Sequence, residues 1–205
     1  MKIKIGIIDY NIGNWGSLRN ALLKIGFGTI ISQNHDELKK SDLLMLPGVG
    51  AFKPAINEII KSGLDQLIYE MVKKDKPMIG ICLGMQLLGR SSLEDEYSKG
   101  LNLIPEDVIP IKKNSCHIGW NSIKISKGRE PLFNPSNDLN FYFNHSYGYP
   151  PNLSSSVYET TFNKKTFTSI IKKGKIVGLQ FHPEKSQKLG LKFLKELILN
   201  LCSND

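Results

Sequence analysis

This 205-residue chain has few cysteines and lacks a long apolar run. The three cysteines, Cys82, Cys116 and Cys202, are widely spaced and form no metal-ligand pattern, so we expect no metal, no cofactor and a reducing cytoplasm. No apolar stretch approaches the roughly 18 residues that a membrane span needs. The short apolar segment at the N-terminus leads directly into fold-like sequence and does not resemble a signal peptide.

Nucleotide- and nucleic-acid-binding patterns are also missing. The loop after the first apolar run, Asp9–Asn14, is not GxGxxG and has no Walker lysine. The net charge is +8, yet the lysines fall in small scattered groups with no interleaved aromatics, which favours solvated faces over a stacking platform for nucleic acid. We therefore expect neither a nucleic-acid partner nor a membrane partner.

The first half of the chain alternates short apolar runs with helical patterns, and the second half is mainly strands. This order predicts one α/β domain over residues 1–205, with a mostly parallel, partly mixed central sheet covered by helices on both faces. The predicted strands are Ile3–Ile8, Gly28–Ile31, Asp42–Leu46, Met78–Ile81, Val108–Ile111, Ser122–Ile125, Asn140–Phe143, Val157–Phe162, Thr166–Ile171 and Lys175–Phe181. The predicted helices are Gly16–Ile25, Pro54–Lys74 with a break near Gly63, and Ser186–Leu201, and a hairpin turn is predicted at Lys172–Lys175.

The most informative segment is Lys76–Leu88, in which an apolar run ends at Cys82 and a helical pattern follows at once. Gly80 and Gly84 flank the cysteine, as a crowded strand–turn–helix elbow requires. A thiol at a helix N-terminus is favoured as the thiolate. A buried structural cysteine is the alternative that this segment alone leaves open.

A second segment, Val177–Lys185, delivers His182, Pro183 and Glu184 at the end of a predicted strand. The imidazole can accept a thiol proton, and the carboxylate can orient the ring and stabilise the imidazolium. Because ligands bind at the carboxyl ends of parallel strands, we expect Cys82 and His182 to converge there.

Together these segments resemble the Cys-His-Glu triad of the class I glutamine amidotransferases, which have a flavodoxin-like fold. Further segments narrow the similarity to the glutaminase subunits of imidazole glycerol phosphate synthase. They are Leu46–Phe52, Gly119–Asn121, Asn144–Tyr147 and Phe181–Ser186.

The resemblance implies a set of roles. Cys82, His182 and Glu184 would form the triad, and the Gly48–Gly50 loop would provide an oxyanion hole through Val49 and Gly50 together with Leu83, with a peptide flip as a further hypothesis. The residues implied to bind L-glutamine are Gly48, Gln86, His145, Ser146 and Tyr147. The residues implied to face a (β/α)8-barrel cyclase subunit, as a heterodimer partner, are Asn11, Asn14, Trp120, Asn121 and Lys185.

Several alternatives remain open at this point. Close paralogues with the same chemistry supply ammonia for amidino-sugar synthesis in surface polysaccharide instead of histidine biosynthesis. A stand-alone cysteine hydrolase and an inactive binding subunit are less favoured, since the motifs and all three triad residues are present. Departures from the family pattern at Ser115–His117, Arg90–Lys99 and Gly148 are expected beside the partner face, where they bear on the identity of the partner.

Overall fold

The computed structural model describes residues 3–112, 115–133 and 139–203. An eight-stranded sheet runs through it, parallel from β2 to β14 and antiparallel from β14 to β9. The strands in spatial order are β2 (Gly28–Ser32), β1 (Lys4–Ile8), β3 (Leu43–Leu46), β4 (Met78–Ile81), β14 (Ile176–Leu179), β13 (Lys165–Lys173), β12 (Ser156–Phe162) and β9 (Lys124–Ile125).

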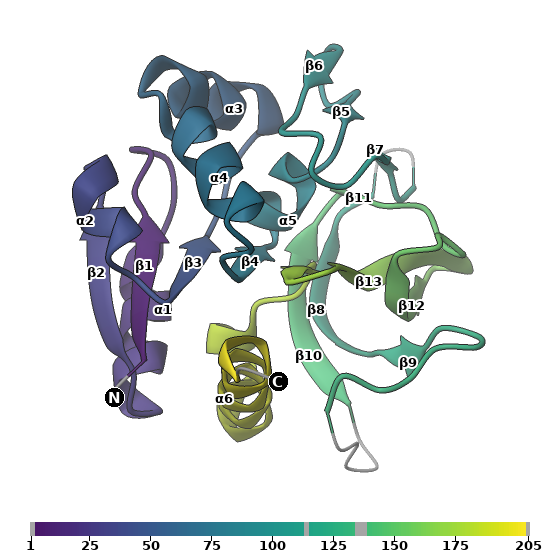
Figure 1. Cartoon of the computed structure of the whole chain (residues 1–205). Coiled ribbons are helices and arrows are strands. Elements are labelled where there is room, and N and C mark those ends of the chain that lie inside the picture. Colours follow the sequence, from purple (N-terminus) through teal and green to yellow (C-terminus); the bar gives the residue numbers. More distant parts are fainter. Residues whose placement is uncertain (1–2, 113–114, 134–138, 204–205) are drawn as a thin grey trace.

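Helices cover both faces of this sheet. They are α1 (Trp15–Lys24), α2 (His35–Lys39), α3 (Phe52–Lys61), α4 (Leu64–Lys73), α5 (Leu83–Leu87), α6 (Gln187–Cys202) and the 3₁₀ turn η1 (Pro183–Lys185). Figure 1 shows α3, α4 and α5 on one side of the sheet and α6 on the other. Among the described residues, no helix combines the length and apolar character needed to cross a bilayer.

The central strands are apolar along their whole length because both of their faces are buried. Along β1, Ile5 and Ile7 join a core that includes the buried side of α6, whereas Ile8 joins a core built from α3, α4 and α5. The two cores therefore lie on opposite faces of one sheet, and the alternation of side chains along each strand divides the apolar residues between them.

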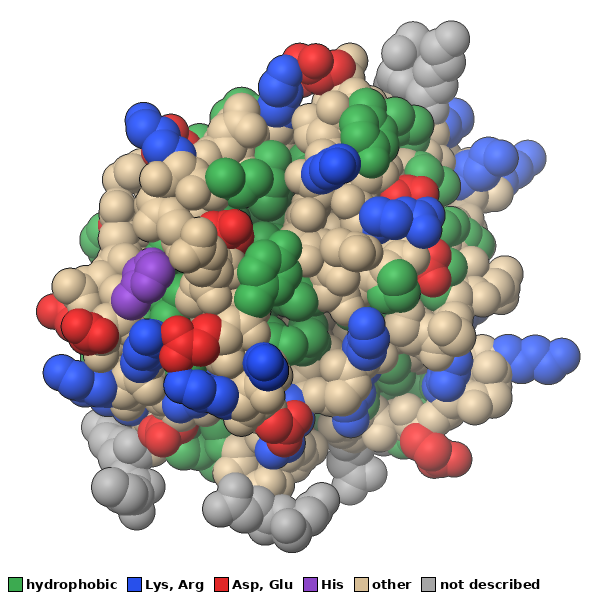
Figure 2. Space-filling model, turned by 45° about the horizontal axis from the view of Figure 1, so that its top comes forward, with side chains coloured by type: hydrophobic (Ala, Val, Ile, Leu, Met, Phe, Trp, Pro, Cys, Tyr) green, Lys and Arg blue, Asp and Glu red, His purple; other side chains and the backbone are tan. Residues whose placement is uncertain are grey.

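Two smaller sheets flank the main one. An antiparallel pair is formed by β8 (His117–Ser122) and β10 (Asn140–His145), and it curves beside α6 in Figure 1. The other contains β11 (Tyr147–Gly148), β7 (Asp107–Pro110), β5 (Ser91–Ser92) and β6 (Ser98–Lys99). On the face seen in Figure 2, Lys and Arg side chains are interspersed with Asp and Glu side chains.

The predicted α/β class and mixed sheet are confirmed. The break near Gly63 is also confirmed, since α3 and α4 are separated there by a residue at φ +70°. The hairpin at Lys172–Lys175 joins β13 to β14, with Gly174 at φ +57°. At the chain ends, residues 1–2 and 204–205 of the predicted domain lie outside the described residues.

One predicted strand was wrong in its bounds, and several elements were missed, among them β8, α2 and the two-residue strands β5, β6 and β11. The predicted strand Ser122–Ile125 divides between the end of β8 and the two-residue β9, because Ile123 breaks away to join the core. The strand β8 itself was missed; its pattern is half exposed and includes Gly119 at φ +126°. Helix α2 was also missed, although the Asn34 side chain caps it by accepting from two backbone N–H groups, because five residues give little periodicity.

Replacement of Gly84 by alanine should destabilise the fold. An added Cβ would overlap the Leu46 carbonyl oxygen of β3, so α5 could not pack against the sheet in its present position. We expect a loss of about 3 kcal/mol in the free energy of unfolding, measured by urea denaturation. The matched control is Gly16→Ala, because Gly16 lies in helix α1 with its nearest neighbour 3.6 Å from the added Cβ. The control should be neutral or stabilising, and equal losses in both variants would contradict the argument.

Candidate active site

The carboxyl end of β4 presents Cys82 in a strained turn. Strand β4 ends at Ile81 and α5 begins at Leu83, which leaves Cys82 between them at φ +53° and ψ −110°. Its backbone N–H donates to the Leu179 carbonyl of β14 over 2.7 Å. An added Cβ on Gly80 would lie 2.7 Å from the Gly84 carbonyl oxygen, so the turn closes only because both positions are glycine. The predicted strand–cysteine–helix elbow is present.

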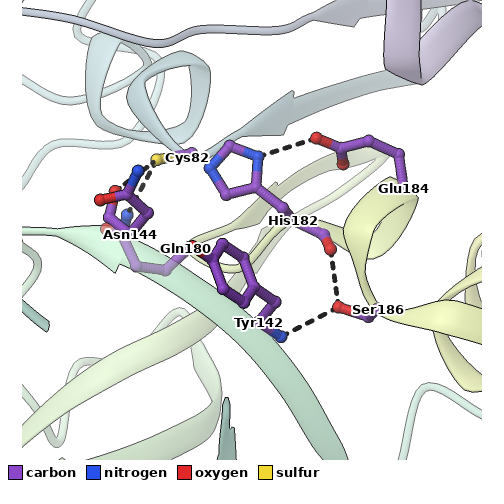
Figure 3. Close-up of polar contacts among 7 residues, drawn as sticks. All are labelled: Cys82, Tyr142, Asn144, Gln180, His182, Glu184 and Ser186. Carbon is purple, nitrogen blue, oxygen red and sulfur yellow. Dashed lines mark hydrogen bonds and ion pairs between the residues drawn. The ribbon is translucent and has the colours of Figure 1, made fainter. Parts of the chain in front are cut away.

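His182 lies across from Cys82, at the end of the segment that follows β14. Its Nδ1 is 2.8 Å from Glu184 Oε1, and both side chains are buried. Figure 3 shows the imidazole between the Cys82 sulfur and the Glu184 carboxylate. Since the carboxylate accepts, Nδ1 carries the proton and Nε2 faces the sulfur. The structure thus brings together the three residues that the sequence grouped as a triad.

Buried backbone contacts hold His182 in place. Its N–H donates to the Tyr142 carbonyl over 2.8 Å, and its carbonyl accepts from the Ser186 hydroxyl over 2.6 Å. The same hydroxyl accepts from the Tyr142 N–H over 3.0 Å, so Ser186 connects the His182 segment to β10 (Figure 3). His182 has extended backbone, φ −100° and ψ 95°, in agreement with the constraint from Pro183.

Opposing influences act on the imidazole of His182. Burial lowers its pKa, but hydrogen bonding and charge from Cys82 and Glu184 outweigh burial and raise the pKa to about 10. The ring is therefore stabilised in the imidazolium form that it would reach by accepting a proton from Cys82. A cysteine–histidine pair in this state holds a nucleophilic sulfur beside a proton donor.

The Cys82 thiol has two further polar neighbours. It lies 3.6 Å from the Asn144 carbonyl, to which it can donate, and 3.9 Å from Gln180 Nε2, which can donate to it. Gln180 is fully buried. Its amide therefore stands beside the sulfur without contact with solvent.

A cavity of about 230 Å³ opens over the Cys82 sulfur. Loops and the ends of helices and strands from both halves of the chain contribute to this cavity. Its lining residues are Val49, Gly50, Cys82, Leu83, Gln86, Glu94, Cys116, Asn144, His145, Ser146 and Tyr147. Most residues predicted to bind glutamine or to form the oxyanion hole therefore line one cavity. Gly48 is the exception, because it lines a smaller adjacent hollow with His182 and Glu184.

The Gly48–Gly50 loop connects β3 to α3 and passes close to the elbow. The buried Tyr10 hydroxyl donates to the Pro47 carbonyl over 2.7 Å and so fixes the start of the loop. An added Cβ on Gly48 would lie 2.7 Å from Leu83 Cβ. At the other end Gly50 has φ +108°, which is strained for any residue with a side chain.

Gln86 lies one turn beyond Cys82 on α5 and is buried. Its Nε2 donates to the Tyr147 carbonyl over 2.7 Å and to Gln180 Oε1 over 3.3 Å. The Tyr147 carbonyl also lies 2.8 Å from Nδ1 of His145. The side chains of Gln86 and His145 therefore meet at the Tyr147 carbonyl at the start of β11, and Gln180 contacts Gln86.

Three of the five residues predicted to face a partner, Asn14, Trp120 and Lys185, line hollows that also contact Glu184. Asn14 and Lys185 line the hollow beside Glu184, and the Lys185 ammonium lies 5.9 Å from the Tyr142 ring centroid. Trp120 is 48% exposed and lines a wide groove of about 840 Å³ between α1 and α6. Asn121 instead turns its amide inward, where it contacts His117 and the Thr161 carbonyl.

The loop before α1 holds Asn11, the remaining residue predicted to face a partner. Its side-chain oxygen accepts from Gln33 over 2.7 Å, and it adopts φ +64°. This position is exposed, as a contact surface requires.

Five residues around the site were missed as functional candidates: Glu94, Cys116, Asn144, Gln180 and Ser186. Glu94 lines the Cys82 cavity and accepts from the Phe52 N–H over 2.8 Å, and burial raises its pKa. The unusual charge of residues 90–99 was the available signal for Glu94, and the motif segment Phe181–Ser186 was the signal for Ser186. Gln180 could be found only from its position beside that motif.

The departures at Ser115–His117, Arg90–Lys99 and Gly148 were expected beside a partner face. The structure places residues from each at the Cys82 cavity or against it. Cys116 and Glu94 line that cavity, and an added Cβ on Gly148 would lie 3.1 Å from Gln180 Oε1. A residue larger than glycine at this position would press on the Gln180 amide beside the Cys82 sulfur.

Comparison with known proteins identifies the family. A family model described as "Glutamine amidotransferase class-I" matches residues 6–200. The chain belongs to the class I glutamine amidotransferase family. The membership predicted from the motifs is thereby confirmed.

Relatives within this family share one name. The chain is 42% identical to the "Imidazole glycerol phosphate synthase subunit HisH" of Lactococcus lactis over 95% of its length and 98% of the relative. Identity to the HisH subunit of Listeria innocua is 43%, covering 93% of each chain. The HisH subunit of the archaeon Methanocaldococcus jannaschii is 42% identical over 95% of this chain and 98% of that one. The amidotransferase therefore belongs with the HisH subunits.

Solved structures of low identity support the fold alone. A structure of PurLQS from Thermotoga maritima superposes with a TM-score of 0.75 at 18% identity, covering 98% of this chain and all of that one. A glutamine amidotransferase from the same organism gives a TM-score of 0.72 at 20% identity, with both chains fully covered. The arrangement of strands and helices in this amidotransferase is therefore shared with distant members of the class.

Replacement of Glu184 by glutamine should lower the pKa of His182. The carboxylate is one of the groups that raise this pKa to about 10, and a neutral amide would leave burial opposed by Cys82 alone. Titration of the ring followed by ¹⁵N NMR should show the midpoint shifting downward by at least one pH unit, a change of about 1.4 kcal/mol. The matched control is Glu159→Gln, which replaces a half-buried carboxylate on β12 outside the Cys82–His182–Glu184 group. If the midpoint of the His182 titration moves in neither variant, Glu184 does not act on the ring.

Proposed function

We propose that this chain is the glutaminase subunit of imidazole glycerol phosphate synthase and hydrolyses L-glutamine to glutamate and ammonia at Cys82. One observation carries the proposal: a cysteine held at φ +53° at a helix start faces a histidine whose other nitrogen lies 2.8 Å from a buried carboxylate. That arrangement activates a thiol for attack on an acyl carbon. Family membership selects a glutamine carboxamide as the acyl group.

The proposed reaction has two halves. The Cys82 proton passes to Nε2 of His182, and the sulfur attacks the side-chain carbonyl carbon of glutamine. His182 then returns the proton to the amide nitrogen, so that the C–N bond breaks, ammonia leaves and a glutamyl thioester remains. In the second half, His182 takes a proton from water as the water attacks the thioester, and glutamate is released with the thiol restored.

Attack creates an oxyanion that backbone N–H groups can stabilise. The N–H of Leu83 lies at the first position of α5, and the loop residues Val49 and Gly50 line the same cavity. We assign the oxyanion hole to these three residues. Gly50, at φ +108°, gives this loop the freedom to reorient one peptide, which supports a peptide flip that completes the hole when the partner's site is occupied.

The rest of the cavity suits the amino-acid end of glutamine. Glu94 supplies a carboxylate for the ammonium group, and Gln86, His145, Ser146 and Tyr147 line the same cavity. Glu94 is the one acidic residue among the lining residues given above. Gly48 contributes by letting the oxyanion loop approach the elbow, where a side chain would collide with Leu83.

Ammonia is useful only if it is kept from solvent, so the proposal includes a (β/α)8-barrel cyclase docked beside the site. The contact face would include Asn11, Asn14, Trp120 and Lys185, with Asn121 behind it. The names of the relatives favour histidine biosynthesis over the amidino-sugar branch and over a stand-alone hydrolase. The three cysteines are free thiols, which agrees with a reducing cytoplasm.

Glutamate release from glutamine should require Cys82 and the barrel cyclase. We expect strong stimulation when the organism's histidine-pathway cyclase and its substrate are added, and loss of activity in Cys82→Ala. The control is Cys202→Ala, a free cysteine at the end of α6 and away from the cavity, which should retain full activity. Stimulation by a cyclase encoded beside sugar-modifying enzymes alone would favour the polysaccharide branch, and no release with either partner would refute the proposal.

Replacement of Gly50 by alanine should lower the stimulated rate. The loop residue would lose its φ near +108°, and removal of one oxyanion donor slows acyl transfer on the order of a hundredfold. We expect this loss in kcat with partner and ligand present, measured by glutamate release. Gly26→Ala is the matched control, because Gly26 has φ +98°, lies outside the cavity and has open space around an added Cβ. Equal rates in the two variants would contradict the assignment of the oxyanion hole to this loop.

A further inference from the structure

Two buried histidines occupy paired positions beside the Cys82 cavity. His117 on β8 is the direct cross-strand neighbour of His145 on β10. Their exposed fractions are 3% and 6%. His117 Nδ1 lies 3.2 Å from His145 Nε2, so the two rings share a hydrogen bond away from solvent. Neither ring belongs to the His182 pair that performs the proposed chemistry.

The hydrogen bonds around these rings fix the position of every proton. The Tyr147 carbonyl can only accept, so the hydrogen of His145 is on Nδ1, 2.8 Å away, and its Nε2 must accept. His117 therefore donates from Nδ1, and its Nε2 must accept in turn. The amide nitrogen of Asn121, 3.2 Å away, is the donor there. The second hydrogen on that nitrogen is directed to the Thr161 carbonyl over 3.1 Å.

Both rings are neutral in this arrangement, and their surroundings agree with that state. Burial lowers the pKa of His117 to about 4 and is the main cause that lowers the pKa of His145 to about 3. His117 is also stacked between two aromatic rings, with centroids 4.7 Å from Phe143 and 4.3 Å from Phe162. The ring plane is thereby set independently of the hydrogen bonds.

The inner end of this chain is the Tyr147 carbonyl, which also accepts from Gln86 over 2.7 Å. Gln86 and Tyr147 both line the cavity over Cys82. A shift of the His145 ring would therefore move the carbonyl that holds Gln86. The outer end is Asn121, next to the exposed Trp120 on the same strand.

We propose that His117 is a positioning residue for glutamine binding: the relay Asn121–His117–His145, each ring donating through Nδ1, holds the Tyr147 carbonyl and through it Gln86. The proposal rests on the proposed glutaminase function. It assigns His117 and Asn121 to substrate recognition although neither lines the cavity. His145 acts in it through its ring nitrogens, and the relay runs from the strand that carries Trp120 to the wall of the cavity.

His117→Phe separates positioning from packing, since the new ring keeps the stack between Phe143 and Phe162 but cannot donate. With the cyclase and its ligand present, we expect KM for glutamine to rise about tenfold, the effect of one lost buried hydrogen bond, with kcat changed less than twofold. The rate at which iodoacetamide alkylates Cys82 should stay unchanged, and protection by glutamine should weaken in parallel with KM. His117→Asn, whose amide can replace Nδ1 as donor, should recover most of the affinity.

Two further variants guard against a purely structural effect. Asn121→Ala removes the outer donor from a part-exposed residue and should raise KM in the same direction by a smaller factor. Phe162→Leu weakens the stack without touching the relay, so it should lower stability and leave KM unchanged. An unchanged KM in His117→Phe, or an equal rise in Phe162→Leu, would overturn the proposal.

The protonation pattern can be checked without substrate. At pH 7, ¹⁵N NMR of the wild-type protein should show His117 and His145 both neutral and both protonated at Nδ1. An Nε2–H form of either ring would overturn the relay. Absence of glutamine hydrolysis by the wild-type complex would instead refute the proposed function, and the two failures are therefore distinguishable.

Discussion

The close approach of α5 to the sheet is the constraint on which the site depends. Gly84 lies against the Leu46 carbonyl of β3, and Gly80 lies under the same helix turn. There is no room for a side chain at either position. Because both residues are glycine, the chain can pass from strand to helix within one residue. That residue is Cys82, and the tight turn requires it to adopt a positive φ. The helix start, the Cys82 thiol and the backbone N–H of Leu83 are all placed by this one contact between backbones.

The second half of the chain completes the site by buried polar contacts. His182 is held through its backbone by Tyr142 and Ser186, and the cavity wall is held by the amides of Gln86 and Gln180. A buried polar group without a partner is costly, so a satisfied network restricts each group to one arrangement. Glu184 Oε2 is an exception among the described residues, since it is buried and has no hydrogen-bond partner there.

The sequence was sufficient to predict the elbow at Cys82 and the pairing of His182 with Glu184. It did not show which distant segments of the chain meet around them. Glycine spacing around Cys82 and the His-Pro-Glu segment each encode local geometry, so the elbow and the base with its carboxylate were predictable. Apolar runs likewise predicted the buried strands, because both faces of such strands are covered. Strand β10 was predicted as Asn140–Phe143, but its partner β8 was missed, since that strand is half exposed and contains Gly119 at a positive φ. Glu94 reaches the cavity and Gln180 reaches the Cys82 sulfur from segments far apart in the chain, and no local pattern predicts that they meet there.

The three histidines near the cavity show how surroundings decide the role of one side-chain type. Burial lowers the pKa of all three, yet His182 faces a thiol and a carboxylate that reverse the effect and stabilise its charge. His117 and His145 have a carbonyl, an amide and each other as partners, and burial therefore keeps them neutral. A ring that is stabilised as imidazolium can exchange a proton with the Cys82 sulfur at little cost. A neutral pair with fixed tautomers resists proton exchange and is suited to holding a carbonyl in place. The proposed division between catalysis by His182 and positioning by the other two rings thus follows from the partners that each ring meets.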